Sequence, residues 1–300
     1  MSVVRRTLGL LFFGVLVRDV IRVGLLILMG LILSERGVNI VLLLTGSASM
    51  MAIFIYANIV NDISDLELDR KAKPYRPLPS GRYTVSEARN ASVVSLLIAV
   101  GSLAVAMWLS FVPSLLVLLG LTAIGAHTYS WPPIRFKARS WLGVISISLI
   151  YVSPLVMGFI IGGVNAGNVP LLVLIFCGIT LASSTKDFED KETDEAMNVR
   201  TPPVVHGIQR TASVLKAAAL LSLLIAIAAG GYYATSGRPW RSLFCLAMIP
   251  PFVLYYARLA AYSRSLDRER LLTLVQGGLW SFYVWPFLAS AATILLPSII

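Results

Sequence analysis

Charged residues are scarce in this chain. Only 13% of its 300 residues are Asp, Glu, Lys or Arg, and 57% are hydrophobic, whereas soluble chains carry about 25% charged residues. The shortage of charge excludes an ordinary soluble domain, and the high apolar content excludes a disordered chain. Two cysteines, Cys177 and Cys245, are too few for a disulfide scaffold. Two histidines, His127 and His206, lie far in sequence from the acidic clusters, so neither zinc nor a redox metal is expected. The composition indicates an integral membrane protein.

Long apolar runs fill most of the sequence. A membrane-spanning helix needs about 20 predominantly apolar residues, and on that criterion the chain is predicted to be an all-α membrane protein, a single domain over residues 1–300. The stretch after Arg5 and Arg6 lacks a small-residue cleavage site, so we expect a retained span rather than a signal peptide. Nine transmembrane helices are expected, near residues 10–33, 38–62, 90–111, 113–130, 141–163, 169–187, 212–235, 241–262 and 272–296.

Basic residues are concentrated in every second loop. The loops after the second, fourth, sixth and eighth predicted spans are basic, and the loops between them carry almost no charge. Cationic loops stay on the cytoplasmic side, so we expect an N-terminus and an active site at the cytoplasmic face of the plasma membrane. The net charge of +10 is then explained by an anionic lipid surface rather than by nucleic acid.

Acidic residues gather in two short windows. Ten of the fifteen lie within 62–69 and 187–195, where the second and sixth predicted spans end. The pattern D-x-x-D-x-x-x-D occurs in both windows with a shift of 125 residues, which predicts an internal duplication of a metal motif. Its members are Asp62, Asp65 and Asp69 in the first window, and Asp187, Asp190 and Asp194 in the second.

Each window can present its three carboxylates together. On a helix, positions i, i+3 and i+7 fall within about 60° of one another, and Asn58 and Asn61 lie beside the first stripe. Three like charges at a membrane edge repel one another and lose hydration, so a cation is expected to neutralise them. Carboxylate and amide oxygens are the ligands that Mg²⁺ prefers. The glutamates that fall off the stripes are interpreted as solvated loop residues: Glu67, Glu189, Glu192 and Glu195.

Two basic loops lie on the same predicted side as the acidic windows. Residues 73–82 contain three prolines and one glycine, which favour a fixed, turning loop over a helix. Residues 129–137 form the second loop. Acidic stripes and basic loops on one membrane face suit a diphosphate that is bridged by metal and held by basic side chains. The basic residues concerned are Lys73, Arg76 and Arg82 in the first loop, and Arg135 and Lys137 in the second.

Arg22 is a cation inside an apolar run. Such a residue is costly in a membrane and usually has a partner. Asp19 or the phosphate site could provide that partner.

At these residues the chain resembles the UbiA-type intramembrane polyprenyltransferases. Their first signature, N-D-x-x-D-x-x-x-D followed by R-P-[LI]-P-S-G, is matched from Asn61 to Asp69 and from Arg76 to Gly81. Their second, D-x-x-D-x-x-x-D near a sixth span, is matched from Asp187 to Asp194. The resemblance covers nearly the whole chain and implies a helical bundle whose central cavity opens sideways to lipid.

The resemblance also implies roles for individual residues. The two motifs would bind Mg²⁺ and the diphosphate of an isoprenoid donor, with Asp65, Asp69, Asp190 and Asp194 in the catalytic centre. Pro132 and Pro133 stretch the second basic loop, which leaves Arg135 and Lys137 as alternatives for the family's lysine. The metal ligands would be Asn61, Asp62, Asp65 and Asp69 for one ion, and Asp187, Asp190 and Asp194 for the other; the substrate-binding residues would be Arg22, Asn58, Asn61, Lys73, Arg76, Arg82, Tyr129, Arg135, Lys137 and Lys186.

The implied reaction is Mg²⁺-dependent transfer of a polyprenyl group from an allylic isoprenyl diphosphate to a lipophilic acceptor. The segments 73–77 and 198–207 are similar to archaeal digeranylgeranylglyceryl phosphate synthases, which implies geranylgeranyl diphosphate as donor and geranylgeranylglyceryl phosphate as acceptor in ether-lipid synthesis. The stretch 129–137 is similar instead to chlorophyll-synthase-like and carotenoid-elongating relatives, and an aromatic quinone precursor of the 4-hydroxybenzoate type is equally compatible. A membrane transporter is the other class considered, but its charges should lie in mid-span, whereas the acidic windows lie at span ends.

Overall fold

Helices are the only regular elements in the residues that the structure, a computed structural model, describes: 17–34, 39–163 and 166–295. Seven of its helical segments are long and apolar enough to cross a membrane. The apolar stretch Ile21–Ser34 is shorter, and α6 (Pro113–Ser130) is not among the seven. The chain is therefore an all-helical membrane protein, and the count of nine spans stays a prediction. Arg5, Arg6 and the first part of the predicted span 10–33 lie outside the described residues.

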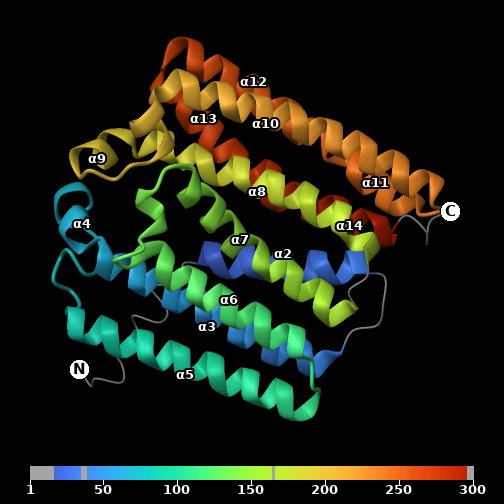
Figure 1. The fold of residues 1–300 in the computed structure, drawn as a ribbon, viewed down its shortest axis with the longest axis horizontal. Coiled ribbons are helices and arrows are strands. Elements are labelled where there is room, and N and C mark those ends of the chain that lie inside the picture. The colour runs from blue at the N-terminus through green and yellow to red at the C-terminus, as the bar shows by residue number, and fades with distance from the viewer. Residues whose placement is uncertain (1–16, 35–38, 164–165, 296–300) are drawn as a thin grey trace. The chain divides into compact units, whose positions relative to one another are not determined.

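The chain divides into two compact units, of which the first runs from Val38 to Lys137 and includes the described chain up to Gly24. Its central helix α3 packs against both α5 and α6 (Figure 1). The Ser49 hydroxyl on α3 donates to the Ala99 carbonyl on α5 at 2.8 Å. The helices of this unit are α3 (Ile40–Ser64), α4 (Leu66–Ala72), α5 (Val85–Leu109) and α6.

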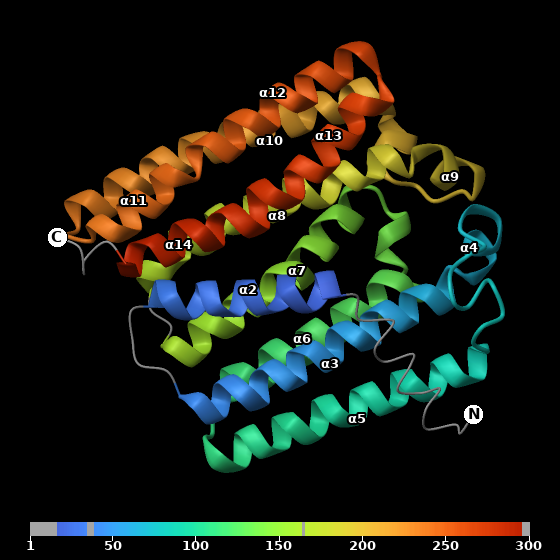
Figure 2. The same ribbon diagram turned by 180° about the vertical axis from the view of Figure 1, so that it is seen from behind.

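The second unit comprises Leu25–Gly37 and Ala138–Ile300. Within it, α8 contacts α7, α10 and α13, and α10 also contacts α11 and α12 (Figure 2). A turn of π-helix, Trp280–Val284, joins α13 to α14. Its helices are the later part of α2 (Val17–Ser34), α7 (Trp141–Gly162), α8 (Val169–Glu189), α9 (Lys191–Ala196), α10 (Pro202–Thr235), α11 (Pro239–Ala247), α12 (Ile249–Ser265), α13 (Arg268–Leu279) and α14 (Trp285–Leu295).

Local sequence explains most helix starts. Thr84 and Glu87 form a reciprocal capping box at the start of α5, and Asn39 caps α3. Proline occupies the first turn of α6, α8, α10, α11 and α12, where its missing N–H is not needed. Pro154 lies inside α7 and cannot bond to the Ile150 carbonyl, which accepts instead from the Ser153 hydroxyl at 2.7 Å. Pro154 therefore does not interrupt α7.

Two helices of the second unit touch through small residues. Gly30 of α2 faces Gly158 of α7, and a Cβ atom on either glycine would lie 2.9 Å from the Cα of the other. One turn further on, Ser34 faces Gly162. This small-xxx-small pairing lets the two backbones approach closely, as in membrane helix pairs.

Gly158→Ala is expected to lower the thermal midpoint of the detergent-solubilised protein. The added methyl group would overlap the carbonyl oxygen of Ile27, and overpacking of this kind costs about 1–3 kcal/mol. Gly101→Ala is the matched control, since nothing lies within 4 Å of a Cβ there and alanine favours a helix. Equal midpoints for the two variants would contradict the close contact between α2 and α7.

Candidate active site

The first acidic window lies at the end of α3, where the helix breaks. Asp62 lies in the last turn of α3, Asp65 separates α3 from α4 with φ −100° and ψ 6°, and Asp69 lies in α4. The backbone bonds nevertheless continue: the Asp65 N–H donates to Asn61 O at 2.9 Å, and the Asp69 N–H donates to Asp65 O at 2.7 Å. The stripe expected from the sequence therefore runs across a helix junction rather than along one unbroken helix.

The second acidic window has the same backbone arrangement. Asp190 separates α8 from α9 with φ −86° and ψ 0°. Its N–H donates to Lys186 O at 3.0 Å, and the Asp194 N–H donates to Asp190 O at 2.8 Å. The break thus falls at the second aspartate of each motif, at positions 125 residues apart.

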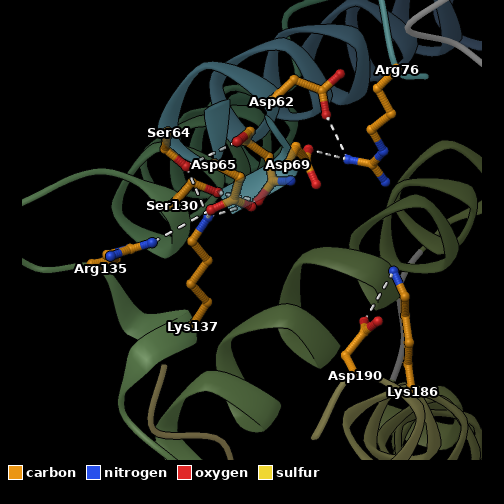
Figure 3. Close-up of polar contacts among 11 residues, drawn as sticks. Asp62, Ser64, Asp65, Asp69, Arg76, Ser130, Arg135, Lys137, Lys186 and Asp190 are labelled. Carbon is orange, nitrogen blue, oxygen red and sulfur yellow. Dashed lines mark hydrogen bonds and ion pairs between the residues drawn. The ribbon is translucent and has the colours of Figure 1, made fainter. Parts of the chain in front are cut away.

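Lys137 binds three residues at the first window. Its ammonium donates to Asn61 Oδ1 at 3.1 Å, Ser64 Oγ at 2.8 Å and Asp65 Oδ1 at 2.6 Å (Figure 3). The side chain is only 10% exposed, and this burial lowers the pKa of Lys137 although the charge of Asp65 opposes the shift. Because an ammonium has three protons, these three contacts use all of its donors.

Arg76 binds the other two carboxylates of the same window. Its Nη1 lies 2.7 Å from Asp69 Oδ2 and 3.4 Å from Asp62 Oδ1 (Figure 3). Burial acts to lower the pKa of Arg76, but the charges of Asp69 and Asp62 and the hydrogen bond to Asp69 outweigh it, and the pKa is raised. Asp69 is almost fully buried, at 2% exposed, so Arg76 is the cation that balances it.

The loop that carries Arg76 is anchored by its own apolar residues. Leu78 and Tyr83 are buried together with Ile59 of α3 and two alanines of α5, Ala88 and Ala91. The loop turns back through bonds from the Ser80 N–H to Arg76 O at 2.9 Å and from the Tyr83 N–H to Pro77 O at 3.2 Å. Gly81 has φ 72°, a left-handed conformation that favours glycine. The anchored loop fixes where the guanidinium of Arg76 can reach.

Arg135 retains a donor without a partner. Its Nη2 lies 3.4 Å from Asp65 Oδ1, but its Nε is buried and makes no hydrogen bond to any described residue. The residue has φ 42°, which is uncommon for a side chain other than Gly, Asn or Asp. Arg135 therefore has one buried N–H that can serve a ligand.

The second window has a weaker basic partner. Lys186 Nζ lies 3.8 Å from Asp190 Oδ2, and these side chains are 61% and 28% exposed. Lys191 pairs with Glu195 at 2.9 Å. Asp187 and Asp194 are half-buried, as are the other predicted residues Arg22, Asn58, Lys73 and Tyr129, whereas Arg82 is exposed.

The described residues contain no group of three or more His, Cys, Asp or Glu side chains placed to hold a metal ion. The oxygens of the first window nevertheless surround cations: Lys137 lies between Asn61 and Asp65, and Arg76 lies between Asp62 and Asp69. This donor set consists of carboxylate and amide oxygens, the hard ligands that suit Mg²⁺. The chemistry of the first window therefore fits a magnesium ion that takes over oxygens now bound by basic side chains.

Sequence reasoning missed the residues that orient this window. Ser64 accepts from Lys137, and the Ser130 hydroxyl donates to Asn61 Oδ1 at 3.1 Å. Tyr56 on α3 bonds to His127 Nδ1 on α6 at 2.7 Å, which holds the end of α6 beside α3. Spacing was the one sequence signal for these two serines: Ser64 follows Asn61 by three residues, and Ser130 is the last residue of the fourth predicted span.

The sequence profile of the UbiA prenyltransferase family matches residues 23–283. The digeranylgeranylglyceryl phosphate synthase of Methanopyrus kandleri is 28% identical over 224 residues, which are 74% of this chain and 78% of that protein. That of Methanothermobacter thermautotrophicus is 33% identical over 168 residues, 55% of each chain. The chloroplastic chlorophyll synthase of Arabidopsis thaliana is 28% identical over 205 residues, 67% of this chain, and the match spans only about half, 52%, of the relative.

Solved structures show the same fold. A UbiA homologue from Archaeoglobus fulgidus bound to GPP and Mg²⁺ superposes with a TM-score of 0.73 at 19% identity, covering 95% of this chain and 99% of the other. A structure described for digeranylgeranylglyceryl phosphate synthase in membranes gives a TM-score of 0.72 at 20% identity, covering 97% and 100%.

Proposed function

We propose that this chain, which belongs to the UbiA prenyltransferase family, transfers a prenyl group from an allylic isoprenyl diphosphate to a lipophilic acceptor. The observation that carries the proposal is the paired arrangement at the first window, where Lys137 binds Asn61 and Asp65 while Arg76 binds Asp62 and Asp69. Oxygens that bind cations, next to basic side chains that can bind phosphate, are what a magnesium diphosphate requires.

Mg²⁺ is the proposed cofactor, with one ion bound by each window. When bound, Mg²⁺ neutralises the negative charge that builds on the departing diphosphate. The similar backbone at Asp65 and Asp190 supports equivalent roles for the two motifs and their origin by duplication. The proposed ligands are Asn61, Asp62, Asp65 and Asp69 from the first window, and Asp187, Asp190 and Asp194 from the second.

The basic residues of the first unit would hold the diphosphate oxygens. Of the two basic residues after α6, Arg135 is the stronger candidate for binding the diphosphate. Its buried Nε has no partner within the described chain, whereas the three donors of Lys137 are all used. Lys137 then orients Asn61 and Asp65 until a ligand competes for its protons. Arg76, fixed by its loop, would bind oxygens on the side of Asp69. The other predicted substrate-binding residues remain proposed in that role: Arg22, Asn58, Asn61, Lys73, Arg82, Tyr129 and Lys186.

The reaction breaks one bond and forms another. The bond between C1 of the donor and the diphosphate oxygen breaks, and its electron pair leaves with the diphosphate. A lone pair on the acceptor forms the new bond to C1, and the acceptor proton goes to the released pyrophosphate. Apolar side chains around C1 would exclude water that could otherwise capture the cation-like carbon. The basic side chains contribute by binding more tightly to the leaving group as its charge grows.

For the substrates, we propose geranylgeranyl diphosphate as donor and geranylgeranylglyceryl phosphate as acceptor, as in ether-lipid synthesis. The archaeal relatives with that name support this choice, and the chlorophyll synthase relative supports a chlorophyll-type acceptor as the alternative. A quinone-type aromatic acceptor also stays compatible with the site. A transporter gains no support from the family assignment.

The proposed topology has nine spans in one domain, with the N-terminus and both windows at the cytoplasmic face of the plasma membrane. The basic loops after α3 and α6 support this orientation. The apolar stretch in α2 and the helix α6 would supply the two spans beyond the seven long ones.

A direct assay tests the function. Purified protein in detergent is expected to release pyrophosphate from geranylgeranyl diphosphate when Mg²⁺ and an acceptor are present, and the product mass identifies the acceptor from a panel of geranylgeranylglyceryl phosphate, chlorophyllide and 4-hydroxybenzoate. EDTA should abolish the release, and Mg²⁺ in excess should restore it. Activity that EDTA leaves undiminished, or no transfer to any acceptor, would contradict the proposal.

A further inference from the structure

A serine one helical turn before the second acidic window has a buried hydroxyl without a partner. Ser183 lies in α8, four residues before Asp187 and seven before Asp190. Its Oγ is buried, and among the residues that the structure describes it has no hydrogen-bond partner. Leaving a buried hydroxyl unsatisfied is destabilising, so a group outside the polypeptide is the natural partner.

The hydroxyl groups around Ser183 are all satisfied inside the helix. Ser184 donates to the Thr180 carbonyl at 2.7 Å, and Thr180 donates to the Phe176 carbonyl at 2.8 Å. Thr185 donates to the carbonyl of Ala182. Bonding back to a carbonyl of the preceding turn is the usual arrangement for a hydroxyl inside a helix. Ser183 alone in this run does not follow it.

Ser183 lies on the same helix face as the aspartates. Steps of four and seven residues turn a helix by about 40° and 20° from full rotations, so Ser183, Asp187 and Asp190 form one row. Four residues correspond to about 6 Å along the axis, which places Ser183 one turn further from the helix end that carries the carboxylates. Asn58 has the same register in the first unit, four residues before Asp62 and 125 before Ser183. A polar uncharged side chain therefore precedes each window by one turn.

In the proposed reaction, the position of Ser183 corresponds to the place where the acceptor attacks the donor. The inference rests on the proposed function: if the aspartates hold the metal-bound diphosphate, C1 of the donor and the atom that attacks it lie next to that group, on the apolar side. A charged side chain would be costly there. A hydroxyl is neutral and can both donate and accept a hydrogen bond, so it suits a neutral nucleophile.

We propose that Ser183 is an acceptor-binding residue, whose hydroxyl binds the nucleophilic hydroxyl of an alcohol acceptor. The hydrogen bond orients the acceptor oxygen toward C1 and transfers no proton. The acceptor class that fits is an alcohol such as geranylgeranylglyceryl phosphate, rather than an aromatic carbon nucleophile.

The test compares Ser183→Ala with Ser184→Ala, a neighbour whose hydroxyl is already bonded within α8. With geranylgeranyl diphosphate, geranylgeranylglyceryl phosphate and Mg²⁺, Ser183→Ala is expected to raise the acceptor KM about tenfold, since a contact made equally in ground and transition states changes KM. The donor KM should stay within about twofold of wild type. Ser183→Thr keeps a hydroxyl and should restore most of the acceptor affinity. Thermal midpoints of all three variants show whether they fold.

The outcomes distinguish a failure of the proposed role of Ser183 from a failure of the proposed function. A wild-type protein that transfers prenyl groups, together with equal acceptor KM values for Ser183→Ala and Ser184→Ala, would overturn the role of Ser183 and leave the proposed function intact. A raised donor KM with an unchanged acceptor KM would also overturn it, because Ser183 would then contact the diphosphate. A wild-type protein without transferase activity would overturn both.

Discussion

Asp65→Asn is expected to lower the turnover of prenyl transfer about 100- to 1,000-fold, the range found when one preorganised electrostatic group is removed from an active site. Asp65 lies at the junction of α3 and α4 and binds Lys137 at 2.6 Å. Asparagine has nearly the same shape and still accepts from Lys137 through its amide oxygen, but it lacks the charge that a magnesium ion needs. Turnover at saturating donor and acceptor, measured over a range of Mg²⁺ concentrations, checks this expectation.

Glu67→Gln is the matched control for Asp65→Asn. Glu67 lies in the same window but off the stripe, is 77% exposed, and pairs only with Arg70 among the contacts described. Its loss of charge should leave turnover unchanged. The second window permits the same comparison, with Asp190→Asn expected to be as damaging as Asp65→Asn and Glu192→Gln expected to be neutral. A normal turnover in Asp65→Asn, or equal losses in Asp65→Asn and Glu67→Gln, would contradict the assignment of the stripes.

Local sequence predicted the position of the windows better than their detailed shape. The spacing of Asp62, Asp65 and Asp69 predicted that their carboxylates share one side, and the structure brings Asp62 and Asp69 to the same guanidinium. The helix break at Asp65 was not predicted, because no Gly or Pro marks it and the backbone hydrogen bonds continue across it. A modest change of φ and ψ at one residue, to −100° and 6°, leaves no signal in hydrophobic periodicity.

The sequence predicted the limits of a long helix where the apolar run alone sets them and packing against other helices does not. Residues 113–130 were expected as a span, and α6 occupies the same range. The span expected at 212–235 instead belongs to α10, which begins at Pro202 and contains a non-helical Gly207 with φ 76°. The first residues of α10, 202–211, are too polar to be recognised by a hydropathy criterion. The sequence signal for this helix start is the pair Pro202 and Pro203, since proline is common in the first turn of a helix. Partners such as Ser64 and Ser130 depend on which helices touch, and spacing along one segment does not contain that information.

Arg76→Ala is expected to weaken donor binding and, in the absence of Mg²⁺, to destabilise the fold. The guanidinium balances Asp69, which is 2% exposed, and a buried carboxylate that loses its partner is strongly destabilising. The loss should stay below the ~3–5 kcal/mol typical of fully buried pairs, because the Arg76 side chain is itself 32% exposed and partly screened by solvent. Mg²⁺ should narrow the difference in thermal midpoint between Arg76→Ala and wild type, since the ion supplies positive charge to the same carboxylates.

Arg70→Ala provides the control, because Arg70 is 55% exposed and its described ion pair is with Glu67 at the surface. Its midpoint and its donor KM should match those of wild type, whereas Arg76→Ala should raise the donor KM at least tenfold, as expected when a charge-assisted contact worth about 1.5–3 kcal/mol is removed. The dependence on Mg²⁺ distinguishes the two roles of Arg76. A midpoint loss that Mg²⁺ does not reduce would mean that Arg76 only anchors its loop, and a donor KM equal to that of Arg70→Ala would mean that it does not bind diphosphate.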